Sequence, residues 1–478
     1  MNSHLLWLLI YTVGITAFGV WIGRRVKGAA DFFVAGRKLP PLLVGSTVLA
    51  ANIGAGTTVG AAGLAYYDGI SAWWWNGAAG IGTLILAFWV APKLWAIAVR
   101  NDHLTVGDFL EHRYSATVRG VVAGLLLIGT LAILAAQLIA GAAVLEVVAG
   151  MPRWQGVAIG GIAMTIYFSA GGLLSSAWVN VVQLIVLAGG FVIALPMVLA
   201  SVGGVQAIAS APTAPASYWD VMHSSGASSG WTMLILLTPS FIISPGLVGK
   251  AYGAESARAI RIGIGAAGVA QLLFSFLPVL LGMSARVHFP DIENPNLVLP
   301  TVLLHELPTF VGALALAAVF SAEVSTCDAI LYMLATSSSK DLYQRLINRS
   351  ATSTQILSVA RAVAVVGGLL GMILAIQFAT IVDALRVFYS LMGATLLVPV
   401  LGALMFRRAT SRDAMAAIAG GVGALLAVYF GTSRKGWWDP SLWGLVGSTI
   451  AFMLSLLISS RTTPGTAPAS GPREATRR

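Results

Sequence analysis

Residues 50–63 read AANIGAGTTVGAAG, and this stretch decides how the surrounding chain is interpreted. It lies inside an apolar window, yet an Asn, two Thr and several Gly occupy its centre. A glycine-rich phosphate loop does not explain it, because no Lys-Ser or Lys-Thr follows the glycines and no strand-turn-helix pattern surrounds them. Close packing of small residues in a membrane bundle is one remaining explanation. The other is a helix broken at mid-membrane depth, whose carbonyls are available to a cation or a solute.

Composition places the chain in a membrane. It has 478 residues, of which 57% are hydrophobic and 10% are charged, and a soluble protein could not cover so much apolar side chain. The first apolar run ends in GRRVKG at 23–28 and similar runs follow, so we expect a first span and not a signal peptide. A single cysteine, Cys327, excludes an intramolecular disulfide. The sequence therefore predicts an all-α integral membrane protein, with the lipid bilayer as its surroundings.

Apolar windows of roughly 20 residues predict about thirteen transmembrane helices. Their approximate limits are 4–23, 39–64, 71–99, 118–149, 154–171, 176–201, 230–250, 258–285, 307–337, 355–379, 382–406, 412–431 and 440–460.

The distribution of basic residues predicts the orientation. If the N-terminus is outside, loops on the inside carry most of the 28 Lys and Arg residues. We therefore expect a multi-pass protein of the cell (inner) membrane with a cytoplasmic C-terminus. The same bias explains the net charge of +10 without a nucleic acid as partner. The Pro-, Ser- and Ala-rich segment 461–478 is expected to be a disordered cytoplasmic tail.

A second interruption supports the broken-helix interpretation. The stretch PSFIISPG at 239–246 interrupts the seventh window, five windows after the first interruption. Because five is odd, the two windows cross the membrane in opposite directions, as an inverted repeat requires.

Several motifs, in a consistent order, resemble the sodium:solute symporter family. They are ADFFVAGR at 30–37, GGL at 171–173 with WVNVVQ at 178–183, AAVFS at 317–321 before KDLY at 340–343, and FRRAT at 406–410. The resemblance implies a LeuT-like core of two inverted five-helix repeats, with one extra helix before it and two after it. The implied division is 1–25 for a peripheral first span, 39–201 and 230–406 for the two repeats, 412–460 for two peripheral spans, and 461–478 for the tail.

The resemblance also implies a Na⁺ site between the first broken helix and the third helix of the second repeat. Backbone carbonyls of Ala50, Ile53 and Ala318 and the hydroxyl of Ser321 would hold the ion. Oxygen atoms are the ligands that a hard cation prefers. The second hydroxyl that the family places here falls at Ala322, which has no side-chain oxygen. In addition, an Asp that the family associates with sodium passage is Asn180 here.

Glu323 follows the missing hydroxyl, and ionisable groups inside membrane spans usually face a cavity or a partner. Its carboxylate is therefore included in the predicted cation site. It could complete a Na⁺ site, carry a proton, or only hydrogen-bond a neighbouring helix. On the first alternative, Ser321→Ala is expected to abolish sodium-dependent uptake.

The solute site is expected near the midplane, between the two interruptions and the facing part of the third window. Its predicted residues are Asn52, Thr57, Trp75, Asn76 and Ser240. An aromatic wall would suit a quaternary ammonium ligand, whereas a carboxylate solute would suit helix N-termini at the breaks. The sequence does not decide between them.

No catalytic constellation or metal-ligand spacing is present, so we expect no enzyme and no cofactor. Transport without an ATPase subunit must draw on a gradient. The sequence therefore predicts a secondary active transporter that imports a small organic solute by cation symport, with Na⁺ favoured as the coupling cation. A proton-coupled symporter that uses Glu323, or a non-coupling sensor or scaffold of the same fold, are the alternatives.

Overall fold

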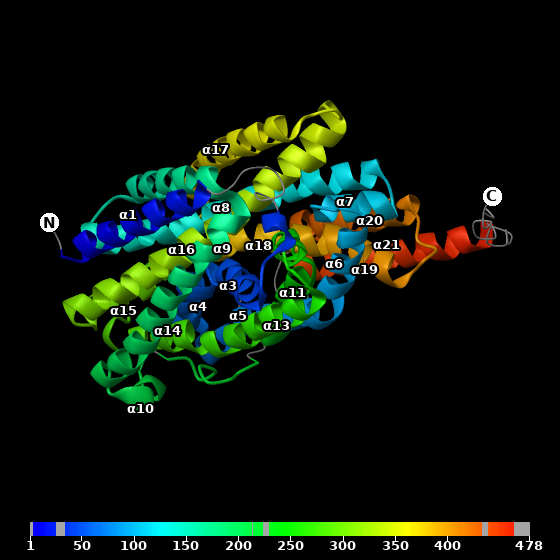
Figure 1. Ribbon diagram of the computed structural model, residues 1–478. Helices are drawn as coiled ribbons and strands as arrows, with labels where there is room; N and C mark the ends of the chain where they lie inside the picture. Colours follow the sequence, from blue (N-terminus) through cyan, green and yellow to red (C-terminus); the bar gives the residue numbers. More distant parts are fainter. Residues whose placement is uncertain (1–2, 25–33, 213, 223–228, 433–437, 463–478) are drawn as a thin grey trace, which may run out of the picture.

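The computed structural model describes residues 3–24, 34–212, 214–222, 229–432 and 438–462. In these ranges the protein is a bundle of helices that run roughly parallel or antiparallel to one long direction (Figure 1). Among these residues the only β pairing is an isolated bridge between Leu39 and Ala254. The predicted tail lies outside the described residues from position 463 on, as does the part of the first family motif at 30–33.

Helices of the first half begin with α1 (Ser3–Gly23), the predicted peripheral span. The following elements are α3 (Pro41–Asn52), η2 (Gly56–Gly60), α4 (Ala61–Asp68), η3 (Gly69–Ala72), α5 (Trp73–Ile85), η4 (Leu86–Val90), α6 (Ala91–Arg100), α7 (Val106–Arg113), α8 (Ala116–Ala149), α9 (Arg153–Ser201) and α10 (Gly204–Ala209).

The second half of the chain also begins with a broken helix, here α11 (Gly230–Ile243) and α12 (Pro245–Tyr252). The following elements are α13 (Ala257–Phe274), α14 (Phe276–His288), α15 (Val298–His305), α16 (Thr309–Thr336), η6 (Ser337–Ile347), α17 (Ser353–Gln377), α18 (Ile381–Met392), η7 (Gly393–Leu397), α19 (Val398–Met405), α20 (Ser411–Gly431) and α21 (Pro440–Thr462).

Eleven stretches in the described part of the chain are long and apolar enough to cross a membrane, and α3 is a shorter apolar helix. A multi-pass membrane protein is therefore confirmed, whereas the count of thirteen, the two repeats and the orientation stay predictions. One difference concerns α9, which covers both windows predicted as 154–171 and 176–201.

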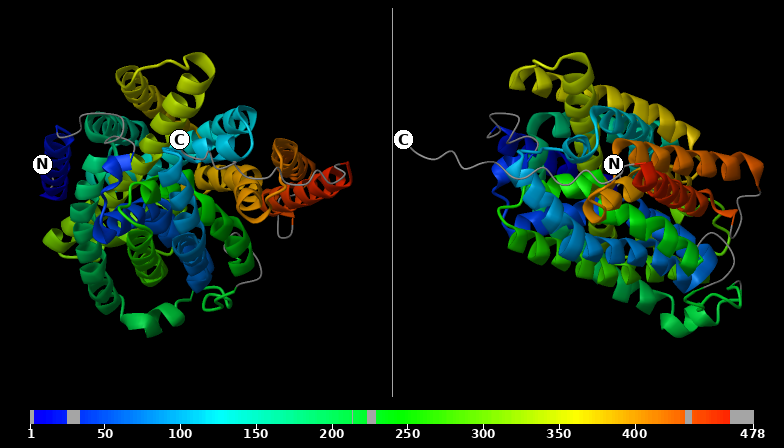
Figure 2. Two further views of the ribbon diagram at one scale, coloured as in Figure 1. Left: turned by 45° about the vertical axis from the view of Figure 1, so that its right-hand side comes forward. Right: turned by 90° about the vertical axis from the view of Figure 1, so that its right-hand side faces the viewer.

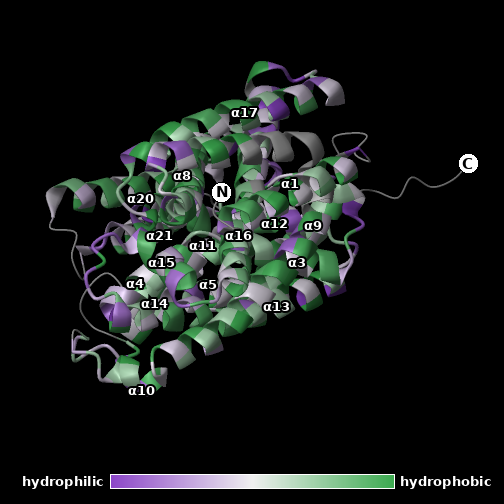
Figure 3. Ribbon diagram, turned by 90° about the vertical axis from the view of Figure 1, so that its left-hand side faces the viewer, coloured by the Kyte–Doolittle hydropathy of each residue, from purple (hydrophilic) through white to green (hydrophobic). Residues whose placement is uncertain are grey.

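The outer surface fits a lipid environment. Large apolar side chains are exposed along peripheral helices, for example Val13 of α1, Ile373 of α17 and Leu457 of α21. Figure 3 shows hydrophobic residues over most of the helical surface and hydrophilic ones gathered mainly near the helix ends and loops. Helices α1 and α20–α21 lie at opposite edges of the bundle (Figure 2), as expected for helices outside the core. The chain between them encloses α3, α8, α16 and α18, which surround the site described next.

Candidate cation and solute site

The stretch quoted first is a broken helix in the structure. Helix α3 ends at Asn52, Ile53 is extended with φ −99° and ψ 90°, and η2 begins at Gly56. The break is held by its own polar groups, because the Thr57 hydroxyl donates to the Asn52 carbonyl at 2.6 Å. The Gly54 carbonyl accepts the backbone N–H groups of Thr57 and Thr58, each at 3.0 Å. The small and polar residues therefore stabilise a non-helical backbone in the interior, where every backbone group needs a partner.

Two amide side chains from other helices fix the same break. Gln137 of α8 accepts the Ala55 N–H at 2.7 Å, and Asn76 of α5 donates to the Thr57 carbonyl at 3.0 Å. Gly54 is needed for this approach, since a Cβ there would overlap both Gln137 Oε1 and Thr326 Oγ1. The absence of a side chain at Gly54 thus lets α8 and α16 reach the backbone of the break.

Helix α16 brings two adjacent hydroxyls to the end of α3. Ser325 Oγ and Thr326 Oγ1 lie 3.0 Å and 3.1 Å from the Ala50 carbonyl oxygen, and both side chains are buried. Ser325 Oγ also lies 2.8 Å from the carbonyl oxygen of Ala322. Two carbonyls and two hydroxyls therefore meet at one buried point beside the break. Such a group of oxygens is a suitable ligand set for a hard monovalent cation.

The predicted hydroxyl ligand, Ser321, lies elsewhere on α16. Its Oγ accepts a hydrogen bond from Tyr11 of α1 at 2.7 Å and donates to the Gln183 carbonyl of α9 at 3.3 Å. Ala318 faces the same way, since a Cβ on Gly190 of α9 would overlap the Ala318 Cβ. The structure therefore brings Ala50 together with Ala322, Ser325 and Thr326, and it does not bring Ser321 and Ala318 to Ala50.

The carboxylate of Glu323 is fully buried and lies against the backbone of Gly141 in α8. Neither of its oxygens has a partner with hydrogen-bond geometry among the described residues. Glu323 precedes Thr326 by three positions, so the two side chains share a face of α16 one turn apart. The acid is thus close to the hydroxyl pair along the helix, and faces α8.

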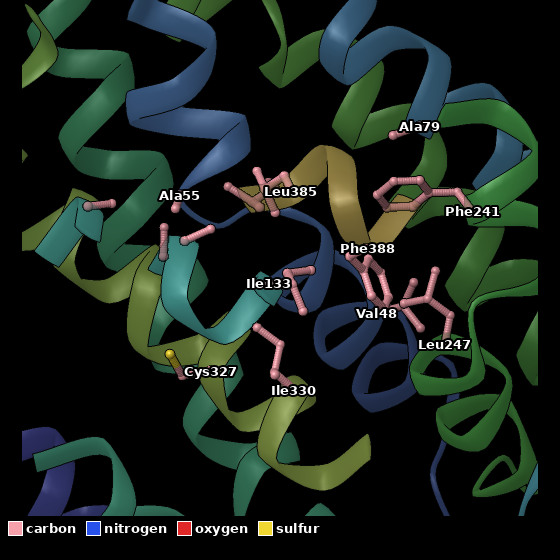
Figure 4. Packing of buried hydrophobic residues seen from close by; sticks show 14 of the residues in the cluster. Val48, Ala55, Ala79, Ile133, Phe241, Leu247, Cys327, Ile330, Leu385 and Phe388 are labelled. Carbon is pink, nitrogen blue, oxygen red and sulfur yellow. The ribbon is translucent and has the colours of Figure 1, made fainter. Parts of the chain in front are cut away.

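A small cavity of about 40 Å³ lies between the two breaks. Its walls are mainly apolar, and Figure 4 shows Ile133, Leu247, Ile330 and Phe388 among the side chains gathered there. The lining residues are Ala51, Asn52, Ile133, Phe241, Ser244, Gly246, Leu247, Thr326, Ala329, Ile330, Met333, Phe388, Tyr389 and Met392. The cavity has room for about one water.

One of the predicted solute residues lines the cavity, and the others hold the helices around it in place. Asn52 lines the cavity, whereas Thr57 and Asn76 hold the break. Trp75 stacks edge-on against Tyr389, with ring centroids 6.2 Å apart, and so supports a wall residue. Ser240 Oγ lies 3.1 Å from the carbonyl oxygens of both Leu236 and Tyr389, which ties α11 to α18.

Two residues near Asn52 are additions that the sequence analysis missed. The Asn52 amide nitrogen donates to Thr83 Oγ1 and to Gln271 Oε1, each at 2.9 Å. This leaves the Asn52 amide oxygen buried without a partner among the described residues. Isolated polar residues such as Gln137 and Gln271 inside apolar windows were the available signal, since polar groups in membrane spans rarely lack a role.

Comparison with known protein families identifies the family of this chain. The model of the sodium:solute symporter family matches residues 32–421, and the chain therefore belongs to that family. The family resemblance predicted from the motifs is thus confirmed, and the protein is a membrane transporter and not an enzyme.

Individual relatives cover nearly the whole chain. The sodium/glucose cotransporter of Vibrio parahaemolyticus is 23% identical over 94% of this chain and 89% of its own length. The sodium/pantothenate symporter of Escherichia coli is 26% identical over 87% of this chain and 88% of its own. A solved Na⁺-coupled sialic acid symporter, in its substrate-bound outward-open state, superposes with a TM-score of 0.82 at 21% identity, covering 96% of this chain and 98% of that one. This last similarity shows the fold.

Proposed function

We propose that the protein imports a small organic solute across the cell membrane, driven by Na⁺ that moves down its gradient in the same direction. The single observation that carries the proposal is the buried group of oxygens at the break of α3, where Ser325 and Thr326 meet the Ala50 carbonyl. The relatives named above are sodium symporters for glucose, pantothenate and sialic acid, which supports the same coupling here.

The ligand set that we propose differs from the sequence prediction by one turn of α16. Ala50 and Ile53 keep their carbonyl roles, and Ala322, Ser325 and Thr326 take the places first given to Ala318, Ser321 and Ala322. In both sets the two hydroxyl positions follow the carbonyl ligand on α16 by three and four residues. The revised set has both hydroxyls, Ser325 Oγ and Thr326 Oγ1, which supports the proposed Na⁺ site. Glu323 lies one turn away from Thr326 on α16.

Solute and ion share the first break in this proposal. Asn52 lines the cavity, and Thr326 borders both the cavity and the proposed ion. Binding of either ligand would thereby favour the arrangement that the other one needs, which is the coupling of a symporter. The two broken helices would move as parts of two inverted repeats, 39–201 and 230–406, to open the cavity alternately to each side. The N-terminus would be outside and the C-terminus in the cytoplasm.

The proposal is tested by the thermal stability of the purified protein, with NaCl exchanged for KCl at constant ionic strength and pH. A ligand that binds only the folded state raises its stability by mass action. We expect a Na⁺-specific rise in the melting temperature that is lost in Ser325→Ala with Thr326→Val. An unchanged Na⁺ response in that double variant would refute the ligand set. Stabilisation at low pH without any Na⁺ response would instead favour a proton carried by Glu323.

A further inference from the structure

A buried lysine borders the proposed Na⁺ site. Lys250 of α12 has 1% of its side chain exposed, and its Nζ donates to the Thr47 carbonyl of α3 at 2.6 Å. Such a short contact is typical of a charged donor. The Thr47 hydroxyl is also occupied, because Asn180 Nδ2 of α9 donates to it at 3.1 Å. Thr47 and Asn180 are both fully buried. Two N–H donors from different helices therefore meet at one residue of α3.

This residue lies one turn before the proposed ligands. Thr47 precedes Ala50 by three positions in an unbroken part of α3, which is a rise of about 4.5 Å. The Lys250 ammonium is thus a resident positive charge near the point where Na⁺ would sit. It lies toward the beginning of α3, which is the cytoplasmic end in the predicted orientation.

Asn180, which also contacts Thr47, is neutral and does not offset the charge of the Lys250 ammonium. The family resemblance places an Asp at position 180, whereas this chain presents an amide whose nitrogen points to Thr47. On the other side of the proposed ligands lies Glu323, one turn from Thr326. The proposed site therefore has a carboxylate on one side and an ammonium with an amide N–H on the other.

We propose that Lys250, beside the neutral Asn180, forms a positive border on the inner side of the Na⁺ site and lowers the affinity of the site for Na⁺. This inference rests on the proposed function. Like charges repel, and in a protein interior the repulsion is screened less than in water. An ion bound at Ala50 is thereby held less tightly. Lys250 is a positioning residue in this account, because it does not ligate the ion.

The experiment measures the NaCl concentration at which half of the Na⁺-specific stabilisation is reached, with KCl keeping the ionic strength constant. The full-length protein is used. We expect Lys250→Met to lower this midpoint about tenfold, the effect of two like charges about 10 Å apart at an effective dielectric constant near 20. Lys250→Arg keeps the charge and is expected to keep the midpoint within about twofold. Asn180→Asp adds a carboxylate beside Thr47 and is expected to lower the midpoint through the opposite change.

Lys340→Met is the matched control. Its ammonium donates to Gln344 Oε1 at 2.9 Å in η6, away from Thr47, so its removal is expected to leave the midpoint unchanged. A merely structural role of Lys250 would change the melting temperature without Na⁺ and leave the midpoint alone. If Lys250→Met does not fold, the midpoint of Asn180→Asp alone tests the proposal.

The two proposals fail in different ways. A wild-type protein that responds to Na⁺, with an unchanged or raised midpoint in Lys250→Met and Asn180→Asp, overturns the positive border and leaves the Na⁺ site intact. A wild-type protein without any Na⁺ response overturns the Na⁺ site itself, and with it the border. A lowered midpoint in both variants, with Lys250→Arg and Lys340→Met unchanged, supports the inference.

Discussion

The two broken helices are interrupted by different means. At the first break, Gln137, Asn76 and the hydroxyls of α16 hydrogen-bond the backbone around Gly54. At the second, a single residue, Ser244, leaves the helical conformation with φ −50° and ψ 121°, and Pro245 begins the next helix. Proline disfavours a helical conformation of the residue before it. The first break is therefore held by its neighbours, and the second is set largely by its own sequence.

This difference gives the two breaks different chemistry. A backbone that must be held by polar partners collects oxygens and amides, and the proposed Na⁺ ligands lie there. A backbone turned by proline needs fewer polar partners, so apolar groups can surround it. Phe241 and Leu247 flank the second break and line the cavity. We therefore expect substitutions at the first break to affect Na⁺ and stability together, and those at the second to affect them less.

The largest effect is expected for Gly54→Ala. The new methyl group would overlap Thr326 Oγ1 and Gln137 Oε1, and overpacking of this kind costs about 3 kcal/mol. The melting temperature should fall and the Na⁺-specific stabilisation should disappear. Gly14→Ala in α1 is the control, because a Cβ there meets nothing within 4 Å. A Gly54→Ala protein that keeps its response to Na⁺ would show that α16 need not approach the break.

Gln137→Leu comes next. It leaves the buried Ala55 N–H without its acceptor, which costs about 2 kcal/mol of the free energy of unfolding. Chemical denaturation in detergent would measure this loss, and the Na⁺ midpoint should rise because the break is less well fixed. Gln206→Leu changes an exposed residue of α10 and should be nearly neutral. Equal stability of the two variants would mean that the break does not depend on α8.

Pro245→Ala is expected to have a smaller effect. Replacing proline where its conformation is compatible lowers stability by about 1 kcal/mol, mainly through the unfolded chain. The Na⁺ midpoint should stay within about twofold of the wild-type value, since no proposed Na⁺ ligand lies at this break. If the variant loses its Na⁺ response as fully as Gly54→Ala, the two breaks are not distinct in function.

Ser321→Ala is expected to have the smallest effect. It removes hydrogen bonds to Tyr11 and to the Gln183 carbonyl, which contribute about 0.5 kcal/mol each to stability. The Na⁺ midpoint should not change, and Tyr11→Phe, which removes one of these bonds from the other side, should behave alike. Loss of the Na⁺ response in Ser321→Ala alone would instead support the ligand set first predicted from the sequence.

Much of the architecture followed from the sequence alone. Apolar windows, the two interruptions and the ordered motifs identified a membrane-spanning member of the sodium:solute symporter family, because hydropathy and chain-local backbone preferences are properties of short segments. The importance of residues 50–63 was also visible, since weak helix formers at mid-membrane depth need an explanation wherever they occur. Asn52, singled out for that reason, lines the cavity between the breaks, and its role in solute binding stays a prediction.

The tertiary structure decided which side chains face one another. On α16, positions 321 and 325 are polar and only one turn apart, so no local pattern says which of them meets the Ala50 carbonyl. The rotation of α16 against α3, α8 and α9 settles it by turning Ser321 toward Tyr11 and Ser325 toward Ala50. The hydrogen bonds between Lys250 and Thr47 and between Asn52 and Gln271 join residues about 200 positions apart in the chain. Such contacts depend on how whole helices pack, and a sequence that fixes each helix leaves their relative rotation to the assembled bundle.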